Sequence, residues 1–215
     1  QLQLDTPMIN FNGSLTHIPG KQWDFEQKIL IDKQYLIDFL DNEKSFEAIF
    51  IAGEYKNKFF ITQDNLDEIY PSLMGVEKIT PDTLIRRERI TSDPHSILMH
   101  TRAEDRYSLA DEMKKHFKYE LEINTWGGPL NILETCAKGV SKATALSYLL
   151  DHYKASPEDL IAFGDEHNDV EMLQLAGTGY AMKNASDKLI PVADRMTRFN
   201  NDEDGVAREL EALFL

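Results

Sequence analysis

The chain has 215 residues, 42% hydrophobic and 28% charged, which is enough for one large domain or two small ones with hydrophobic cores. The formal net charge of -14 argues against a nucleic-acid surface, because no basic stripe is available to neutralise phosphates. A small phosphorylated ligand stays compatible with this charge, since a bound cation and one or two lysines can reverse the local field.

Membrane and disulfide features are missing from the sequence pattern. The longest apolar runs have about four or five residues, far fewer than the ~20 that a membrane-spanning helix needs. No signal-peptide pattern opens the chain. The single Cys136 cannot form an internal disulfide and fits a reducing compartment, so we expect a cytoplasmic protein.

The first predicted element is a short buried strand at Met8, Ile9 and Phe11, followed by a turn at Asn12-Gly13. Asparagine tolerates a left-handed backbone, and glycine lets the chain pass close to another group. Asn12 is therefore either a plain turn residue or a residue of a site.

Between residues 20 and 129, strands and helices alternate without an even βαβ rhythm, which predicts a separate mixed α+β domain. Helices are predicted at 32–40, where Asp32 is the cap, and at 64–73 and 104–117; strands are predicted at 46–52, 58–61, 84–90, 97–101 and 119–123. Two local basic clusters, 56–58 and 86–89, are interpreted as solvated strand faces in preference to ligand contacts. The loop at 126–129, Trp-Gly-Gly-Pro, could admit a ligand or could equally be a turn.

The second half is a plain α/β alternation. It has a strand at 131–134, a helix that begins after Ser141, strands at 160–163 and 178–182, a helical segment from Asn184 and a C-terminal helix with Val206, Leu210 and Leu213 on one side.

Lys142 falls in the first turn of the helix that Ser141 caps. A cation there opposes the helix dipole by a few tenths of a kcal/mol, a cost that an anion near the same helix end would offset. The alternative is a lysine whose long side chain carries its charge into solvent.

The stretch Gly164-Asp165-Glu166-His167-Asn168-Asp169 follows a short buried strand and opens a helix. Open α/β sheets bind ligands at the carboxyl ends of their strands, and two carboxylates four residues apart suit a hard cation. The alternative is that Asp165 only caps the helix and its acidic neighbours only complement the helix dipole.

Four motifs in this order resemble the Cof-type branch of the haloacid dehalogenase-like phosphatases. They are Gly-Val-Ser-Lys at 139–142, Gly-Asp-Glu-His-Asn-Asp at 164–169, Ala-Met-Lys-Asn-Ala at 181–185 and Asp-Gly-Val at 204–206. The resemblance covers essentially the whole chain. It implies an α/β fold with a Rossmann-like parallel-sheet core, built from residues 1–19 and 130–215, and an inserted α+β cap domain at 20–129.

The resemblance also implies a function: Mg²⁺-dependent hydrolysis of small phosphorylated metabolites through an aspartyl-phosphate. Carried over to this sequence, Asp165 becomes a Mg²⁺ ligand, and Asp169 becomes a direct ligand or a partner acting through water. Lys142 becomes the catalytic lysine that neutralises the nucleophile and the phosphoryl group. Asn168, Asn12 and Asn184 are assigned to phosphate or substrate binding. His167 falls at a variable position and is not expected to be catalytic.

One part of the family pattern is absent. No Asp-x-Asp-Gly-Thr motif precedes Pro7, so the nucleophilic aspartate is expected upstream of these residues, on a missing segment that includes the central strand of the sheet. The fragment by itself is then expected to be inactive. A catalytically inactive binding or regulatory protein and a phosphomutase on the same scaffold are the alternatives, and the sequence leaves the substrate and the oligomeric state open.

Overall fold

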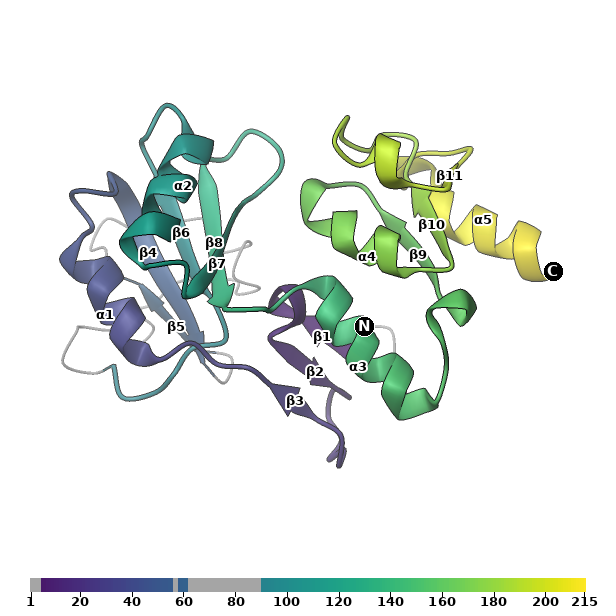
Figure 1. The fold of residues 1–215 in the computed structure, drawn as a ribbon, viewed down its shortest axis with the longest axis horizontal. Coiled ribbons are helices and arrows are strands. Elements are labelled where there is room, and N and C mark those ends of the chain that lie inside the picture. Colours follow the sequence, from purple (N-terminus) through teal and green to yellow (C-terminus); the bar gives the residue numbers. More distant parts are fainter. Residues whose placement is uncertain (1–4, 56–57, 62–89) are drawn as a thin grey trace. The chain divides into compact units, whose positions relative to one another are not determined.

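The computed structural model describes residues 5–55, 58–61 and 90–215 (Figure 1). The chain divides into two compact units. The first extends to Phe25 and resumes at Ser141–Leu215, and the second comprises Glu26–Val140.

The first unit begins with an antiparallel hairpin of β1 (Met8–Asn10) and β2 (Leu15–His17), in which Ile9 lies opposite Thr16. The turn between them, the 3-10 helix η1 (Phe11–Gly13), contains Asn12 at φ 51° and Gly13 at φ 118°. The predicted Asn-Gly turn is therefore confirmed, and both residues adopt left-handed backbone conformations.

The remainder of the first unit is an alternation of helices and parallel strands. Its elements are α3 (Lys142–Tyr153), η5 (Pro157–Asp159), β9 (Ile161–Gly164), η6 (His167–Asp169), α4 (Val170–Leu175), β10 (Thr178–Ala181), η7 (Ile190–Val192), β11 (Arg195–Met196), η8 (Asn201–Glu203) and α5 (Gly205–Phe214). Within the described residues β10 lies between β9 and β11 and is parallel to both. A small core of Ala162, Leu173, Ala181 and Leu189 joins α4 to this sheet.

The second unit contains β3 (Gln27–Lys28), α1 (Lys33–Asp41), β4 (Ala48–Tyr55), β5 (Lys58–Ile61), β6 (Ile97–Thr101), α2 (Arg106–His116), β7 (Leu121–Thr125) and β8 (Ile132–Ala137). In its described part, five of these strands form an antiparallel sheet in the order β5-β4-β6-β8-β7. Figure 1 shows α1 and α2 together on one face of this sheet.

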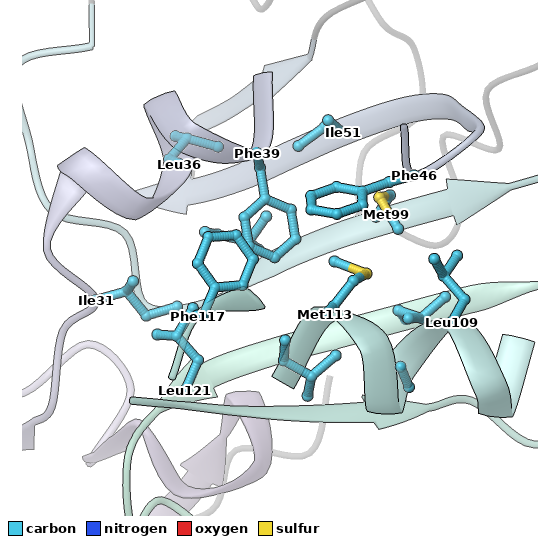
Figure 2. Close-up of a cluster of buried hydrophobic side chains, with 14 of the residues drawn as sticks. Ile31, Leu36, Phe39, Phe46, Ile51, Met99, Leu109, Met113, Phe117 and Leu121 are labelled. Carbon is cyan, nitrogen blue, oxygen red and sulfur yellow. The ribbon is translucent and has the colours of Figure 1, made fainter. Parts of the chain in front are cut away.

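Aliphatic side chains and three phenylalanines form the core between those two helices and the sheet (Figure 2). Phe39 of α1 is fully buried and stacks on Phe117, with ring centroids 4.9 Å apart and planes 8° apart. Phe46 packs edge-on against Phe39, and Met99 and Met113 are also fully buried in this cluster. The helix α1 begins where the sequence predicts, because the Asp32 carboxylate accepts a hydrogen bond of 2.8 Å from the Gln34 N–H.

The boundaries between the two units fall at different residues from the domain boundaries that the sequence suggested. The strand expected at 131–134 in the core domain is β8, which pairs with β6 on one side and with β7 on the other. An interior strand cannot leave its sheet without losing two ladders of hydrogen bonds. The second unit therefore extends to Val140, and it begins at Glu26 where a boundary after residue 19 was expected.

Two other expectations differ from the structure. Between Asn184 and β11 the described residues form no α-helix; turns lead to the short 3-10 helix η7, where Pro191 removes a backbone donor. The apolar side of α5 is exposed, since Val206, Leu210 and Leu213 keep 38–39% of their surface accessible. The helix expected at 64–73, the strand expected at 84–90 and the basic cluster at 86–89 lie outside the described residues, as does most of the cluster at 56–58.

No described helix combines the length and the apolar composition that crossing a membrane requires.

We expect Phe39→Ala to lower the free energy of unfolding of the second unit by about 3–5 kcal/mol, because it deletes a fully buried ring and leaves a cavity. Urea unfolding followed by Trp126 fluorescence in a Trp23→Phe background measures this, since the chain has two tryptophans. Tyr107→Ala, at a side chain 47% exposed on α2, is the control and should cost less than about 1 kcal/mol. Equal losses in the two variants would contradict the assignment of the core.

Candidate active site

The site is built at the carboxyl end of β9. This strand runs parallel to β10, with Phe163 opposite Tyr180 and Gly164 opposite Ala181. The chain then turns through Asp165 and η6 into α4, as the sequence predicts. Two backbone hydrogen bonds hold this turn to the segment after β10: the Met182 N–H donates to Gly164 O and the Ser186 N–H donates to Asp165 O, each at 2.8 Å.

Asp169 is the buried carboxylate of the site, only 3% exposed. Its Oδ2 accepts hydrogen bonds from the backbone N–H groups of Asp165 at 3.0 Å and of Glu166 at 3.2 Å. Its Oδ1 forms an ion pair with the Lys142 ammonium. Both carboxylate oxygens are thus engaged by donors of the protein itself.

The absence of a side chain at Gly164 allows Asp169 to lie close to the end of β9. A Cβ atom added at residue 164 would lie 2.5 Å from the Cβ of Asp169 and 2.9 Å from a methyl carbon of Leu173, which is closer than real Cβ contacts come. A side chain at position 164 would therefore push Asp169 away from the end of the strand.

Lys142 is the first residue of α3, and the predicted cap is confirmed. The Thr144 N–H donates to Ser141 Oγ at 3.3 Å, and the Ser141 N–H donates to Thr144 Oγ1 at 2.9 Å, which forms a reciprocal capping box. The sequence left open whether the Lys142 charge meets an anion or solvent. The structure shows the anion, Asp169, while 31% of the lysine side chain stays accessible.

Asp165 is half-buried and lies beside this pair. Burial raises the pKa of its carboxyl, the negative charges of Asp169 and Glu166 raise it further, and the Lys142 ammonium opposes these effects. Ionisation of Asp165 is thus less favourable here than in water. A carboxylate in such surroundings gains more from a bound cation than an exposed one does.

A hydrogen bond between Asn12 and Asn168 joins the N-terminal hairpin to the turn after β9. The Asn168 Nδ2 donates a hydrogen bond of 3.0 Å to Asn12 Oδ1. The hairpin can approach α3 because residue 13 is glycine: a Cβ there would lie 2.4 Å from Ser141 O. Two residues 156 positions apart in sequence are therefore joined next to Asp165 and Asp169.

A cavity of about 460 Å³ lies in the first unit at this point. Lys142, Asp165, Asp169 and Asn12 line its polar part, together with Asn201. Apolar side chains line the remainder: Ile9, Leu146, Phe163, Met172, Met182 and Val206, with Gly164 at the end of β9.

Two sequence-assigned residues, Asn168 and Asn184, do not line the cavity. Asn168 contacts the lining residue Asn12 through the hydrogen bond described above. Asn184 is exposed and does not line the cavity; its Oδ1 accepts a hydrogen bond of 3.2 Å from the Asn201 N–H, and Asn201 does line it. Sequence reasoning missed Asn201, because nothing in the spacing of an asparagine after a loop marks it as a site residue. His167, not expected to be catalytic, is half-buried and is not a lining residue.

The donor set is compatible with a divalent cation that keeps part of its water shell. Among the described residues no group of three histidine, cysteine, aspartate or glutamate side chains converges as a closed metal site. Mg²⁺ is commonly held by one or two carboxylates, waters and a substrate phosphate, so an open site of this kind suits it. Asp165 is the better candidate for direct ligation, since both oxygens of Asp169 already accept from Lys142 and two backbone amides.

The chain matches the family model of the haloacid dehalogenase-like hydrolases over residues 1–210, and it belongs to this family. It is 30% identical over 214 residues to the 5-amino-6-(5-phospho-D-ribitylamino)uracil phosphatase YitU of Bacillus subtilis, covering all of this chain and 78% of that protein. It is 40% identical over 105 residues to the phosphatase YcsE of the same organism, which is named for the same substrate; that match covers 49% of this chain and 40% of YcsE.

A solved structure supports the fold. The chain superimposes on a haloacid dehalogenase-like hydrolase from Bacteroides thetaiotaomicron with a TM-score of 0.75 and 24% identity, over 94% of this chain and 74% of that one. The predicted fold class is thereby confirmed: an α/β protein with a Rossmann-like core and a cap. The resemblance to the Cof-type branch is confirmed as well.

In the presence of EDTA, removing the charge of Asp165 and removing the charge of Asp169 should change the thermal stability in opposite directions. Folding raises the pKa of Asp165, so the folded protein holds the proton of this carboxyl more tightly than the unfolded chain does. Ionisation of Asp165 therefore destabilises the fold as pH rises from about 4 through the raised pKa. Asp165→Asn should therefore raise Tm at pH 7, and the gain should shrink toward pH 4.

Asp169→Asn should lower the free energy of unfolding by about 2–3 kcal/mol at pH 7, because it breaks a charge pair with a buried carboxylate. Thermal unfolding by circular dichroism compares the two variants. A fall in Tm for Asp165→Asn of the size seen for Asp169→Asn would contradict the assigned charge environment.

Proposed function

We propose that this protein is a Mg²⁺-dependent phosphatase of small phosphorylated metabolites. Membership of a hydrolase family and similarity to named phosphatases support the reaction class. The observation that carries the proposal is the meeting of Lys142, Asp165 and Asp169 on one cavity at the end of β9. An ammonium beside a carboxylate that can bind a metal ion favours a phosphate ester over a neutral substrate, because the ammonium and the ion together neutralise the charge of the phosphate.

Each residue has a distinct part in this proposal. Lys142 binds the phosphoryl oxygens and balances the negative charge that a carboxylate nucleophile brings. Asp169 holds the ammonium in place from a buried position and takes part as a positioning residue. Asn12 presents its amide group to a phosphate in the cavity, and Asn168 holds Asn12 in place by a hydrogen bond to its Oδ1. Asn184 acts through Asn201, whose backbone it fixes at the cavity.

Asp165 would bind Mg²⁺ directly, and Asp169 would contribute as a neighbouring carboxylate that does not itself contact the ion. The cation would neutralise charge on the phosphate and polarise its oxygens. The raised pKa of Asp165 supports this role, because the same burial and neighbouring charges that disfavour the bare carboxylate favour its pairing with a cation.

We infer that the nucleophile is an aspartate carried by a segment of the full-length protein outside these 215 residues. The one Asp-x-Asp pair in the sequence, Asp202 and Asp204, is exposed and does not line the cavity. In the transfer, the nucleophile's carboxylate oxygen forms a bond to phosphorus as the ester P–O bond breaks, and the leaving oxygen takes up a proton. Water then cleaves the aspartyl-phosphate and releases phosphate.

The second unit is proposed as the cap that contributes to substrate selection. The names of the relatives point to a phosphorylated ribitylamino-pyrimidine as the first substrate to try. We also propose a cytoplasmic location, because Cys136, the single cysteine of the sequence, cannot form an internal disulfide and fits a reducing compartment.

The full-length protein should release phosphate from p-nitrophenyl phosphate when Mg²⁺ is added and should lose this activity in EDTA. Lys142→Ala should lower kcat by about 10²–10³-fold, because it removes the cation beside the transferring group. Asp165→Ala should abolish the response to Mg²⁺. The matched control is Lys138→Ala, an exposed lysine four positions earlier that pairs with Glu120.

The products separate the alternatives. Transfer of phosphate to an added sugar phosphate in place of water would identify a phosphomutase. Absence of turnover in the full-length protein, with Mg²⁺-dependent ligand binding retained, would identify a binding protein. Unchanged activity in Asp165→Ala would refute the assigned metal ligand.

A further inference from the structure

The first connection between the two units leaves the first unit through an exposed segment. From Pro19 to Phe25 every residue except Trp23 is exposed, and Phe25 is the last residue of the first unit. A segment of this kind has few buried contacts to hold it, so its backbone is expected to open easily. The side chains of Trp23 and Phe25 nevertheless have specific partners.

Both aromatic rings pack on His152 near the end of α3. The Trp23 ring meets the imidazole edge-on, with centroids 5.3 Å apart and planes at 85°. The Phe25 ring lies 4.0 Å from the imidazole at 47°, and the two aromatic rings are 6.0 Å from each other. The edge-on arrangement of Trp23 and His152 is one that aromatic pairs favour.

A hydrogen bond fixes the backbone at the same point. The Tyr148 Oη donates to Phe25 O at 3.0 Å. Tyr148 and His152 are four residues apart on α3, so they present neighbouring side chains on one face of the helix. The last residue of the connection within the first unit is therefore held by both its side chain and its carbonyl group.

The second connection reaches the same helix. It re-enters the first unit at Ser141, the N-cap of α3, whose backbone and side chain form the capping box with Thr144. The second connection runs directly into α3, which begins with Lys142 (Figure 1), and the first is held to the same helix by the contacts of Trp23, Phe25 and Tyr148.

We propose that Trp23, Phe25 and His152 form a clamp that fixes the first connection to α3, so that the two connections are anchored to one helix. Residues 18–25 move with α3 and do not act as a free linker.

Hydrogen–deuterium exchange of the full-length protein tests the clamp without requiring activity. In Trp23→Ala/Phe25→Ala, the hydrogen-bonded backbone amide within residues 18–26, Lys21 N–H, which donates to Ile18 O at 3.2 Å, should exchange about tenfold faster than in the wild type, equivalent to about 1.4 kcal/mol. Exchange in β9 and β10 should stay unchanged, which shows that the unit remains folded. Tyr148→Phe should accelerate exchange at the same amide by a smaller factor, because it removes only the hydrogen bond to Phe25 O.

Tyr153→Ala is the matched control, since Tyr153 is 60% exposed and its ring contacts His152 from within α3. It should change exchange of the Lys21 amide by less than about twofold. The clamp is refuted if the Lys21 amide of the wild type exchanges as fast as in an unstructured peptide, or if the double variant leaves its exchange unchanged. A protein that shows the expected exchange but no phosphatase activity would refute the proposed function and leave the clamp intact.

Discussion

The candidate site depends on how the buried carboxylate of Asp169 is satisfied. Taking an ionised carboxylate out of water is costly unless donors replace its hydration. Two backbone N–H groups from the turn after β9 and the ammonium of Lys142 supply that replacement. The same contacts fix the turn that carries Asp165 and orient the first residue of α3. One charged group therefore links the strand end to the helix start, and the cavity forms between them.

This linkage needs close backbone approaches at two points, and glycine provides both. Gly164 leaves room for Asp169 beside the end of β9, and Gly13 lets the N-terminal hairpin reach the carbonyl of Ser141. The hairpin contributes Asn12 to the cavity, and α3 contributes Lys142. Segments from the two ends of the chain thus meet in one unit, although 115 residues of a second unit, Glu26–Val140, separate them in sequence.

The charges at this site are unbalanced in a way that suits a phosphate ester together with a cation. The Lys142 ammonium pairs with Asp169, and the pKa of Asp165 is raised first by burial and then by the negative charges of Asp169 and Glu166. The chain as a whole carries a net charge of -14, so its long-range field does not attract anions. Recognition of a phosphate would therefore rest on local groups: Lys142, the polar pair Asn12 and Asn168, and a cation held by Asp165.

The sequence alone determined those features that local chemistry controls. The Asp32 and Ser141 caps, the Asn12-Gly13 turn and the strand ending at Gly164 follow from residue preferences over a few positions, and the motif order was sufficient to indicate the family. The tertiary structure alone decided that Lys142 pairs with Asp169, that Asn201 lines the cavity in place of Asn184, and that β8 belongs to the second unit. These outcomes depend on which distant segments pack together. Burial and pairing between them are set by the whole fold, so no local pattern of residues encodes them.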